Sequence, residues 1–205
     1  MGFYGERVLP HLLNLAMRNQ DLAAYRRRVV PAARGRVLEI GIGSGLNLPF
    51  YGSKADGVIG LDPSSPLLAM AERQAKAGQM PVTMLQGSAE AIPLEDASVD
   101  TVLTTWTLCS IPDAHAALAE MRRVLKPAGE LVFVEHGKAP DAAVARWQDR
   151  LTPLWRPMAG GCHLNRPIDA LIKDAGFSFT ELQCGYMMRG PRPFTFMYEG
   201  RATRT

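Results

Sequence analysis

The sequence predicts a doubly wound α/β fold: a mostly parallel, seven-stranded sheet with helices on both faces and further helices at the N-terminus. Short apolar runs typical of buried strands alternate with stretches in which apolar residues recur at helical spacing. Glycines or other turn-forming residues end several of the runs. With 205 residues, the chain can bury one core and leaves little room for a second domain. We therefore expect residues 1–205 to form a single domain.

The first elements follow from local spacing. Residues 4–29 place apolar side chains at helical intervals, which predicts one or two helices, bent near Pro10 and broken around 19–21. This helical segment occupies residues 1–35. A short apolar run, Arg36–Ile40, then stops at a glycine-rich turn, as a buried parallel strand does.

Strands and helices alternate from there. Ser65 can cap a helix, and Pro66 suits its first position. Further strands are predicted at 57–61, 82–86, 99–104, 130–135, 178–183 and 193–198, and further helices at 65–77, 113–125 and 168–175. Such alternation winds a parallel sheet with right-handed crossovers.

Cysteine usage and hydropathy indicate a cytoplasmic protein. The cysteines, Cys109, Cys162 and Cys184, are odd in number and form no CxxC pair, so neither a disulfide framework nor a structural metal site is indicated. No apolar run approaches the roughly 20 residues that span a bilayer, and the N-terminus shows no secretory signal.

The charge pattern does not decide whether the N-terminal segment contacts a membrane surface or an acidic partner. The net charge is only +3, but basic residues cluster near the start, at Arg18, Arg26, Arg27, Arg28, Arg34 and Arg36. A basic N-terminal helix could make peripheral contact with a membrane surface or meet an acidic partner, although a solvated helix face is favoured over both. Basic and aromatic residues do not interleave, so no nucleic-acid partner is predicted. The oligomeric state is not readable from the sequence.

The loop after the first strand is the place to seek a ligand, because doubly wound sheets bind ligands beyond the carboxyl ends of their strands. It reads EIGIGSG over residues 39–45. Glycines let a ligand approach the main chain, and free amides at the start of a following helix would add donors. A structural turn, a dinucleotide site and a nucleoside-type cofactor site all compete for such a loop. Leu46 stands where a dinucleotide fingerprint needs glycine or alanine, which disfavours a nicotinamide oxidoreductase.

An acidic residue, Asp62, ends the second predicted strand and is followed by Pro63. A carboxylate there can accept hydrogen bonds from both hydroxyls of a ribose. Its position suits either kind of cofactor, and a plain turn aspartate is the alternative. Asp62 therefore supports a ribose more than it selects the molecule.

Four segments together resemble a known family. VLEIGIGSGLN (37–47), GLDPS (60–64), GSAEAIPLEDASVD (87–100) and RRVLKPAGELVFVEHG (122–137) are similar to the consecutive motifs of class I S-adenosylmethionine (AdoMet)-dependent methyltransferases, nearest to the ubiquinone and menaquinone biosynthesis group. The resemblance implies a Rossmann-like methyltransferase fold, AdoMet as cofactor and a transferase activity.

The resemblance also implies site residues. The three loop glycines would line the methionine part of AdoMet, Asp62 would hold the ribose, and Ser88 and Ala89 would face the adenine. Many relatives have aspartate in place of Ser88, so Glu90 is an alternative adenine contact. Backbone at Thr104 or Thr105 would meet the amino group. The predicted cofactor-binding residues are Glu39, Gly41, Gly43, Gly45, Asp62, Pro63, Ser88, Ala89, Glu90 and Thr105.

A finer likeness covers the later chain. TLCSI (107–111), VEHG (134–137) and TPLWRPMAGGCHLNRP (152–167) are similar to segments of the methyltransferase-like family whose animal members methylate thiols on membranes. This implies a small or hydrophobic thiol as the leading acceptor and a substrate-covering insertion at 138–167. It places His163 and Asn165 over the substrate, with a plain loop role as the alternative.

A thiol acceptor needs little proton chemistry, because a free thiol is already partly ionised at neutral pH. His136, after the fifth strand, is a candidate base or orienting group, although it could merely cap the strand. A small buried core residue is the favoured interpretation of Cys109. Tail residues Trp147, Trp155, Met158, Met187 and Met188 would either fill the core or form an apolar acceptor pocket. Alternative functions are methylation of a quinone precursor or phospholipid amine, and a non-catalytic AdoMet-binding module.

Overall fold

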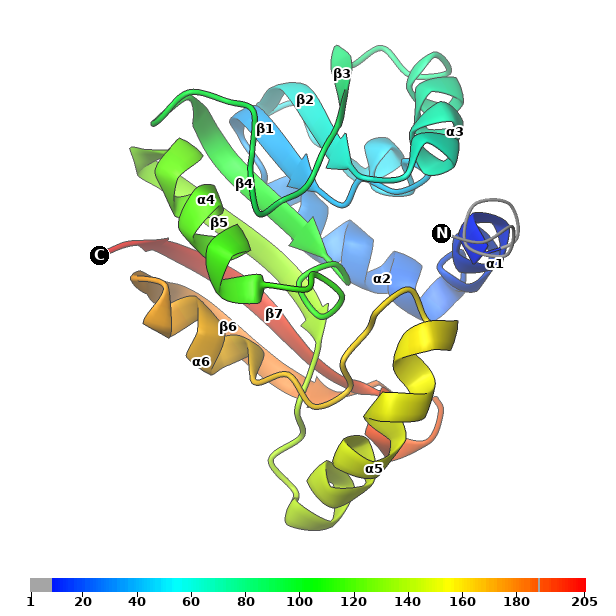
Figure 1. Cartoon of the computed structure of the whole chain (residues 1–205). Helices are drawn as coiled ribbons and strands as arrows, with labels where there is room; N and C mark the ends of the chain where they lie inside the picture. Colours follow the sequence, from blue (N-terminus) through cyan, green and yellow to red (C-terminus); the bar gives the residue numbers. More distant parts are fainter. Residues whose placement is uncertain (1–8, 188) are drawn as a thin grey trace.

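In the computed structural model, which describes residues 9–187 and 189–205, seven strands form one sheet in the order β3-β2-β1-β4-β5-β7-β6 (Figure 1). The strands are β1 (Gly35–Ile40), β2 (Ala55–Asp62), β3 (Val82–Gln86), β4 (Val99–Thr105), β5 (Leu125–His136), β6 (Phe177–Tyr186) and β7 (Phe196–Arg204). The predicted mostly parallel, seven-stranded sheet is confirmed.

The pairing of the strands locates the switch point. β1 pairs in parallel with β2 on one side and with β4 on the other. β3 and β5 extend these two halves in parallel. β7 is antiparallel to both of its neighbours, β5 and β6. The order of the strands therefore reverses between β1 and β4, where doubly wound sheets bind ligands.

Helices cover both faces of the sheet. They are α1 (Leu9–Ala16), α2 (Gln20–Val29), α3 (Ser65–Ala75), α4 (Ala114–Val124), α5 (Ala142–Met158) and α6 (Ile168–Asp174). On one face, α4 and α6 pack on a core that includes Leu38 and Ile40 of β1. On the other, α2 and α3 pack on a core that includes Val37. The period of two along β1 thus divides its apolar side chains between two cores.

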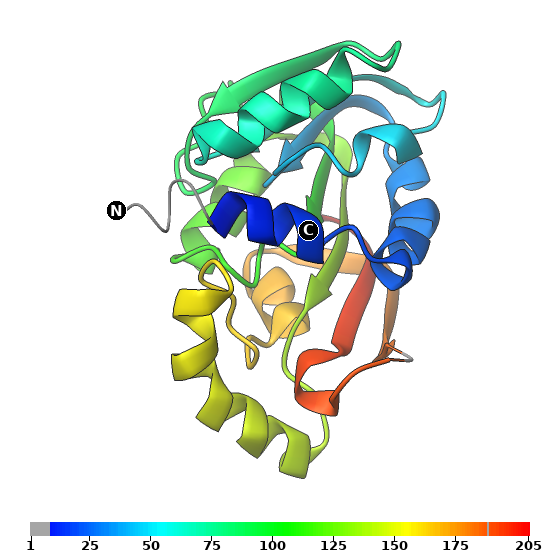
Figure 2. The ribbon, with the colours of Figure 1, turned by 90° about the vertical axis from the view of Figure 1, so that its right-hand side faces the viewer.

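Figure 2 shows the molecule turned by 90°, with α1 and α5 on the side that faces the viewer. This is the side toward which β1 and β4 point in Figure 1, so α1 and α5 lie across the edge formed by the carboxyl ends of the strands. No helix in the described ranges is both long and apolar enough to cross a bilayer.

The structure departs from the predictions in several places. β5 begins at Leu125 and not at Glu130, because Leu125 already pairs with Val99 of β4. The helix expected after the glycine loop is only a short 3₁₀ turn, Leu48–Phe50, because nine residues containing Pro49 and Gly52 join Gly45 to β2. Helix α5 went unpredicted because prolines at 153 and 157 lie inside it. The last strand runs over 196–204 and not 193–198, since its polar second half is paired on both sides, by β5 and β6.

The break between the first two helices is confirmed, with Asn19 as the cap of α2: its Oδ1 accepts from the amide of Leu22 at 2.9 Å. The expectations for residues 4–8 and for Met188 lie outside the described residues.

Candidate active site

The loops that follow the parallel strands β1 to β5 meet at one edge of the sheet, because parallel strands end on the same side. They comprise residues 41–47, 62–64, 87–90, 105–111 and 136–137. All the predicted cofactor-binding residues except Glu39, within β1, belong to these loops or to the last residue of a strand.

The glycine loop adopts a backbone that only glycine takes readily. Gly41, Gly43 and Gly45 have φ values of 67°, 55° and 80°. A β-carbon at Gly41 would lie 2.2 Å from Oγ1 of Thr107, so the loop crosses the residues after β4 at close range. A β-carbon at Gly43 would meet only a carbonyl oxygen, at 3.9 Å. Gly41 therefore lies where the glycine loop contacts the loop after β4. The missing side chain of Gly43 leaves open space above the glycine loop.

Asp62 closes the other side of this space. It is 6% exposed, and each carboxylate oxygen accepts a main-chain hydrogen bond: Oδ2 from Gly43 at 3.0 Å and Oδ1 from Ser64 at 2.8 Å. Burial raises the pKa of Asp62. The same carboxylate thus ties the glycine loop to the start of α3 and retains lone pairs for a further donor.

Glu39 lies beneath the loop in a buried polar network. Its two oxygens accept from Asn47 Nδ2 at 2.8 Å and from the Tyr51 hydroxyl at 2.7 Å. Asn47 also donates to Thr105 Oγ1 at 2.9 Å and accepts from Arg26 Nε at 3.0 Å. Burial raises the pKa of Glu39 to about 7, against the opposing effect of these donors. Through Asn47, the network links β1, the end of β4 and α2.

The loop after β3 is organised by Glu90. Its carboxylate accepts from the Ser88 hydroxyl at 3.0 Å and from the Asp113 amide, at the start of α4, at 2.7 Å. Ala89, between them, is buried. Ser88 is exposed, and Pro63 is exposed on the neighbouring loop.

The chain after β4 is held from below by Glu135, a fully buried residue of β5. Its Oε1 accepts from Thr104 Oγ1 at 2.7 Å and from the amides of Thr107 and Leu108, both at 3.0 Å. Its Oε2 accepts from the amide of Cys109 at 3.3 Å. Burial raises the pKa of Glu135 to about 7. One carboxylate therefore shapes residues 107–109.

Arg166 holds the same loop from above. Its Nη1 donates to the carbonyls of Leu108 at 2.6 Å and Ile111 at 2.7 Å. The amide of His163 donates to the carbonyl of Cys109 at 2.9 Å, and His163 Nδ1 lies 3.1 Å from both that carbonyl and Arg166 Nη2. Residues 160–166 thus lie directly on the loop after β4.

His136 and two cysteines occupy this junction. His136 is 5% exposed, and neither ring nitrogen has a hydrogen-bond partner among the described residues. The pKa of the Cys162 thiol is lowered, first by the adjoining Cys109 thiol and then by His136, and the pKa of Cys109 is raised. Buried polar atoms are normally satisfied, so the imidazole, which lies close enough to Cys162 to lower the pKa of its thiol, calls for a further partner such as a water or a ligand.

Asn165 points elsewhere. Its Nδ2 donates to Asp149 Oδ1 at 2.7 Å, and its Oδ1 accepts from Thr152 Oγ1 at 3.3 Å. Both partners belong to α5, so the amide of Asn165 fastens this helix to the covering segment. This arrangement favours the alternative structural role over the predicted catalytic one.

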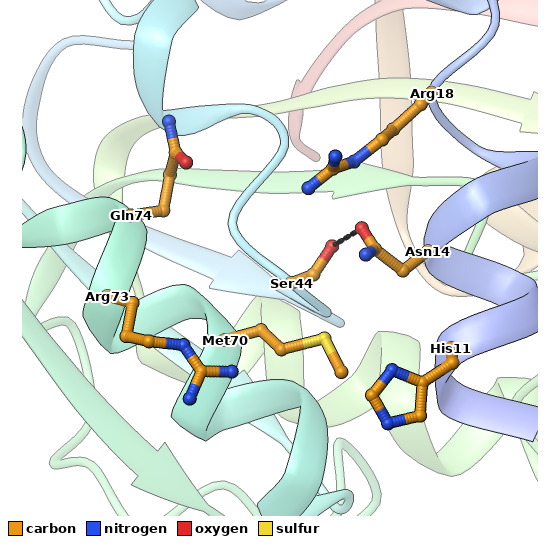
Figure 3. A pocket seen from close by; sticks show the side chains of 7 residues that line it. All are labelled: His11, Asn14, Arg18, Ser44, Met70, Arg73 and Gln74. Carbon is orange, nitrogen blue, oxygen red and sulfur yellow. Dashed lines mark hydrogen bonds between the residues drawn. The ribbon is translucent and has the colours of Figure 1, made fainter. Parts of the chain in front are cut away.

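A cavity of about 330 Å³ opens between α1 and α3, next to the glycine loop (Figure 3). Ser44 contributes the loop's wall, and its hydroxyl donates to Asn14 Oδ1 of α1 at 2.8 Å. Arg18 and Arg73 reach into it from opposite sides. Among the described residues, two guanidinium groups and no carboxylate line the cavity, so this part of its wall favours an anionic group.

Sequence reasoning missed the two residues that clamp the loop after β4. A signal for Glu135 was present: a charged residue inside an apolar strand must find buried partners. Arg166 carried no comparable signal, because an arginine in a loop is ordinarily solvated. The network of Arg26 and Asn47 was also missed, since its members lie 21 residues apart.

The chain is similar to known methyltransferases. Residues 38–133 match the Methyltransferase domain family. Thiol S-methyltransferase TMT1B of Rattus norvegicus is 34% identical over 170 residues, which cover 80% of this chain and 66% of that protein. The Homo sapiens TMT1B is 33% identical over 174 residues, covering 82% and 69%. The chain thus spans about two thirds of the length of these relatives.

A further relative and a solved structure are similar to this chain as well. Phosphatidylethanolamine N-methyltransferase of Cereibacter sphaeroides is 39% identical over 129 residues, covering 59% of this chain and 63% of that one. A SAM-dependent methyltransferase of Thermotoga maritima has the same fold, with a TM-score of 0.71, 24% identity and full coverage of both chains. The chain therefore belongs to the class I family of AdoMet-dependent methyltransferases, whose cofactor is S-adenosylmethionine.

Proposed function

We propose that this protein transfers the methyl group of AdoMet to a small or hydrophobic thiol. One contrast among the relatives carries the proposal. The thiol S-methyltransferases match 80–82% of this chain, whereas the phosphatidylethanolamine and quinone-type methyltransferases match 55–66%. The family domain itself ends at residue 133. The longer likeness thus includes chain beyond the shared cofactor domain, and we propose that this part of the chain sets the acceptor specificity.

The residues present fit the cofactor. We propose that AdoMet lies over the glycine loop, where Gly43 leaves open space, with its ribose hydroxyls donating to Asp62. Ser88, Ala89 and Glu90 would face the adenine. Pro63 and Thr105 would border the cofactor, while Glu39 would act from beneath the loop through Asn47.

The chemistry divides between cofactor and chain. When bound, AdoMet supplies a methyl group already activated by the positive sulfur. The chain must hold a thiolate about 3 Å from the methyl carbon, in line with the leaving sulfur, and exclude water. The methyl group that bound AdoMet would supply would end on the acceptor sulfur, so the products would be a methyl thioether and S-adenosylhomocysteine.

We propose that His136 accepts the proton of the acceptor thiol. Its ring nitrogens are buried and unpaired among the described residues, at the end of β5. Such an imidazole can accept a proton or orient the sulfur. We propose that residues 138–167 cover the acceptor and that His163 and Asn165 position this segment. The mixed apolar and polar junction suits a thiol better than a charged acceptor.

A second candidate is methylation of a phospholipid amine, favoured by the 39% identity to the phosphatidylethanolamine enzyme over the shared domain. An assay that measures S-adenosylhomocysteine release from AdoMet, with alkyl thiols, aromatic thiols, quinols or phosphatidylethanolamine vesicles, separates the candidates. Thiols alone should support turnover. Turnover on the vesicles but not on thiols would contradict the proposal, and cofactor binding without turnover on any acceptor would indicate a non-catalytic binding module.

The His136→Gln variant tests the acceptor side. We expect kcat/KM for a thiol to fall about 10- to 100-fold at neutral pH, with AdoMet affinity unchanged, and the loss to shrink as rising pH ionises the thiol. The matched control is His115→Gln, because His115 is an exposed residue of α4. Equal activity of the two variants at every pH would remove His136 from the reaction.

A further inference from the structure

Two cysteines from distant parts of the sequence meet where the covering segment lies on the loop after β4. Cys109 belongs to that loop, and Cys162 belongs to residues 160–166. The structure buries Cys109, as the sequence favoured, but it places this thiol beside a second one. Neither thiol takes part in the proposed methyl transfer.

Main-chain contacts on both sides of Cys162 fix this arrangement. The amide of His163 donates to the carbonyl of Cys109 at 2.9 Å. On the other side, a β-carbon at Gly161 would lie 3.0 Å from the carbonyl oxygen of Ser110. Bond lengths alone then keep the α-carbons of Cys109 and Cys162 within about 8 Å of each other. A disulfide needs about 4.4–6.8 Å between them, so it can close with little movement of the main chain.

The two thiols differ in access and in ionisation. Cys162 is partly exposed, whereas Cys109 is buried. The adjoining Cys109 thiol and then His136 lower the pKa of Cys162 against the effect of burial, and the Cys162 thiol and burial raise the pKa of Cys109. The thiolate is the form of cysteine that reacts. Cys162 is therefore placed to meet an oxidant first, and Cys109 to react with the product.

The third cysteine lacks this environment. Cys184 is an exposed residue of β6 and pairs with Tyr198 of β7. Burial of its sulfur and then Asp169 raise the pKa of its thiol, and no second thiol contributes. Cys184 thus provides an internal comparison for the other two.

We propose that Cys109 and Cys162 are a site of reversible oxidation, at which a peroxide converts the two thiols to a disulfide. The Cys162 thiolate attacks one oxygen of hydrogen peroxide and becomes a sulfenic acid. The hydroxide released as the O–O bond breaks takes up the proton that Cys162 had lost and becomes water. The Cys109 sulfur then attacks the Cys162 sulfur, and its proton leaves with the sulfenic hydroxyl as a second water. The two thiols together give two electrons to the peroxide.

The disulfide would join the covering segment to the loop after β4 by a covalent bond. In the reduced protein, hydrogen bonds hold the two together, including those from Arg166 to the carbonyls of Leu108 and Ile111 at 2.6 and 2.7 Å. Thiols that enter beneath residues 160–166 need these bonds to open. Oxidation should therefore stop acceptor entry while AdoMet still binds over the glycine loop. This consequence, unlike the disulfide itself, rests on the proposed function.

Peroxide treatment of the Cys184→Ser variant tests the disulfide without cofactor or acceptor. The variant retains only the two thiols in question, and the replaced residue is exposed, so folding should not change. Hydrogen peroxide in small molar excess should remove both free thiols, counted in denaturant, and lower the mass by about 2 Da. Dithiothreitol should restore both values. Peptide mass mapping should find Cys109 joined to Cys162 within one chain.

The matched control is the double variant Cys109→Ala, Cys184→Ser, which keeps Cys162 alone. Without a second thiol, Cys162 should gain oxygen, by about 32 Da for the sulfinic acid, and dithiothreitol should not reverse this. Oxygen addition to Cys162 in both proteins, a bond between two molecules, or two thiols that survive the peroxide would overturn the proposal.

A separate measurement tests the effect on turnover. After removal of peroxide, the oxidised Cys184→Ser variant should methylate a thiol about tenfold more slowly or worse in initial-rate assays, with AdoMet affinity unchanged, and dithiothreitol should restore the rate. A disulfide that leaves the rate unchanged would contradict the closing of the acceptor site. A disulfide in a protein whose reduced form methylates no thiol would contradict the proposed function and leave the oxidation site established.

Discussion

The two halves of the ligand edge are built differently. On the β1–β2 side, three glycines and one aspartate within 22 residues shape the space with main-chain geometry. On the β4–β5 side, residues 107–111 are clamped between Glu135 and Arg166, two ionisable side chains from distant parts of the chain. The β1–β2 side, where we propose that the cofactor binds and which we call the cofactor half, is thus formed by residues close together in the sequence. The β4–β5 side, where we propose that the acceptor binds and which we call the acceptor half, is formed by residues that only the fold brings together.

The largest predicted effect falls on the acceptor half. Glu135→Ala should lower the free energy of unfolding by about 3–5 kcal/mol, because three amides, two of them buried, and a buried threonine hydroxyl lose their acceptor. Urea unfolding measures this loss. Glu130→Ala, on the same strand, is the control: its ion pair with the half-exposed Arg34 spans 3.6 Å, so its removal should cost less than about 1 kcal/mol. Similar losses would show that the clamp is unimportant.

The glycine loop allows a comparison within the cofactor half. Gly41→Ala should cost about 2–4 kcal/mol, because it combines a left-handed backbone with a clash against Thr107. Gly43→Ala should cost only about 1–2 kcal/mol, since its β-carbon meets open space. Thermal or urea unfolding of both variants checks the difference. Equal costs would mean that the crossing of the two loops does not select glycine at 41.

The two halves share a pH dependence. Burial raises the pKa values of Glu39 and Glu135 to about 7, so both carboxyls hold their protons more tightly in the folded than in the unfolded protein. Their contribution is full below about pH 4 and is lost as pH rises to about 7. Between pH 5 and 7.5, stability should fall by on the order of 1–3 kcal/mol. Glu135→Gln should flatten this slope, and a slope that rises would contradict the assignment.

The smallest effect should come from Asn165, which lies in the covering segment but bonds to α5. Asn165→Ala should cost about 0.5–1.5 kcal/mol of stability and change kcat for a thiol less than about threefold. Parallel unfolding and steady-state measurements separate the two roles. A large fall in kcat without loss of stability would return Asn165 to the reaction, as the sequence predicted.

The features that the sequence could predict lie mostly on the β1–β2 side of the site, and those that it could not predict lie mostly on the β4–β5 side. The order of the strands, the positions of most of them, the glycine loop and Asp62 could be predicted because alternation, turn residues and motif spacing are local signals. Helix α5 could not, since its prolines 153 and 157 oppose the helix while burial of Gln148 and Thr152 supports it. Nor could the clamp of Glu135 and Arg166, whose residues come together only when β5 and the covering segment are placed.

The direct test of the account is calorimetry of AdoMet binding to the unchanged protein and to Asp62→Ala. AdoMet should bind and NAD should not, and the variant should lose about 1–3 kcal/mol of binding free energy, roughly 5- to 150-fold in Kd, because two ribose hydroxyls lose a charged acceptor. Binding of NAD in place of AdoMet, or the same AdoMet affinity in both proteins, would contradict the placement of the cofactor between the glycine loop and the end of β2.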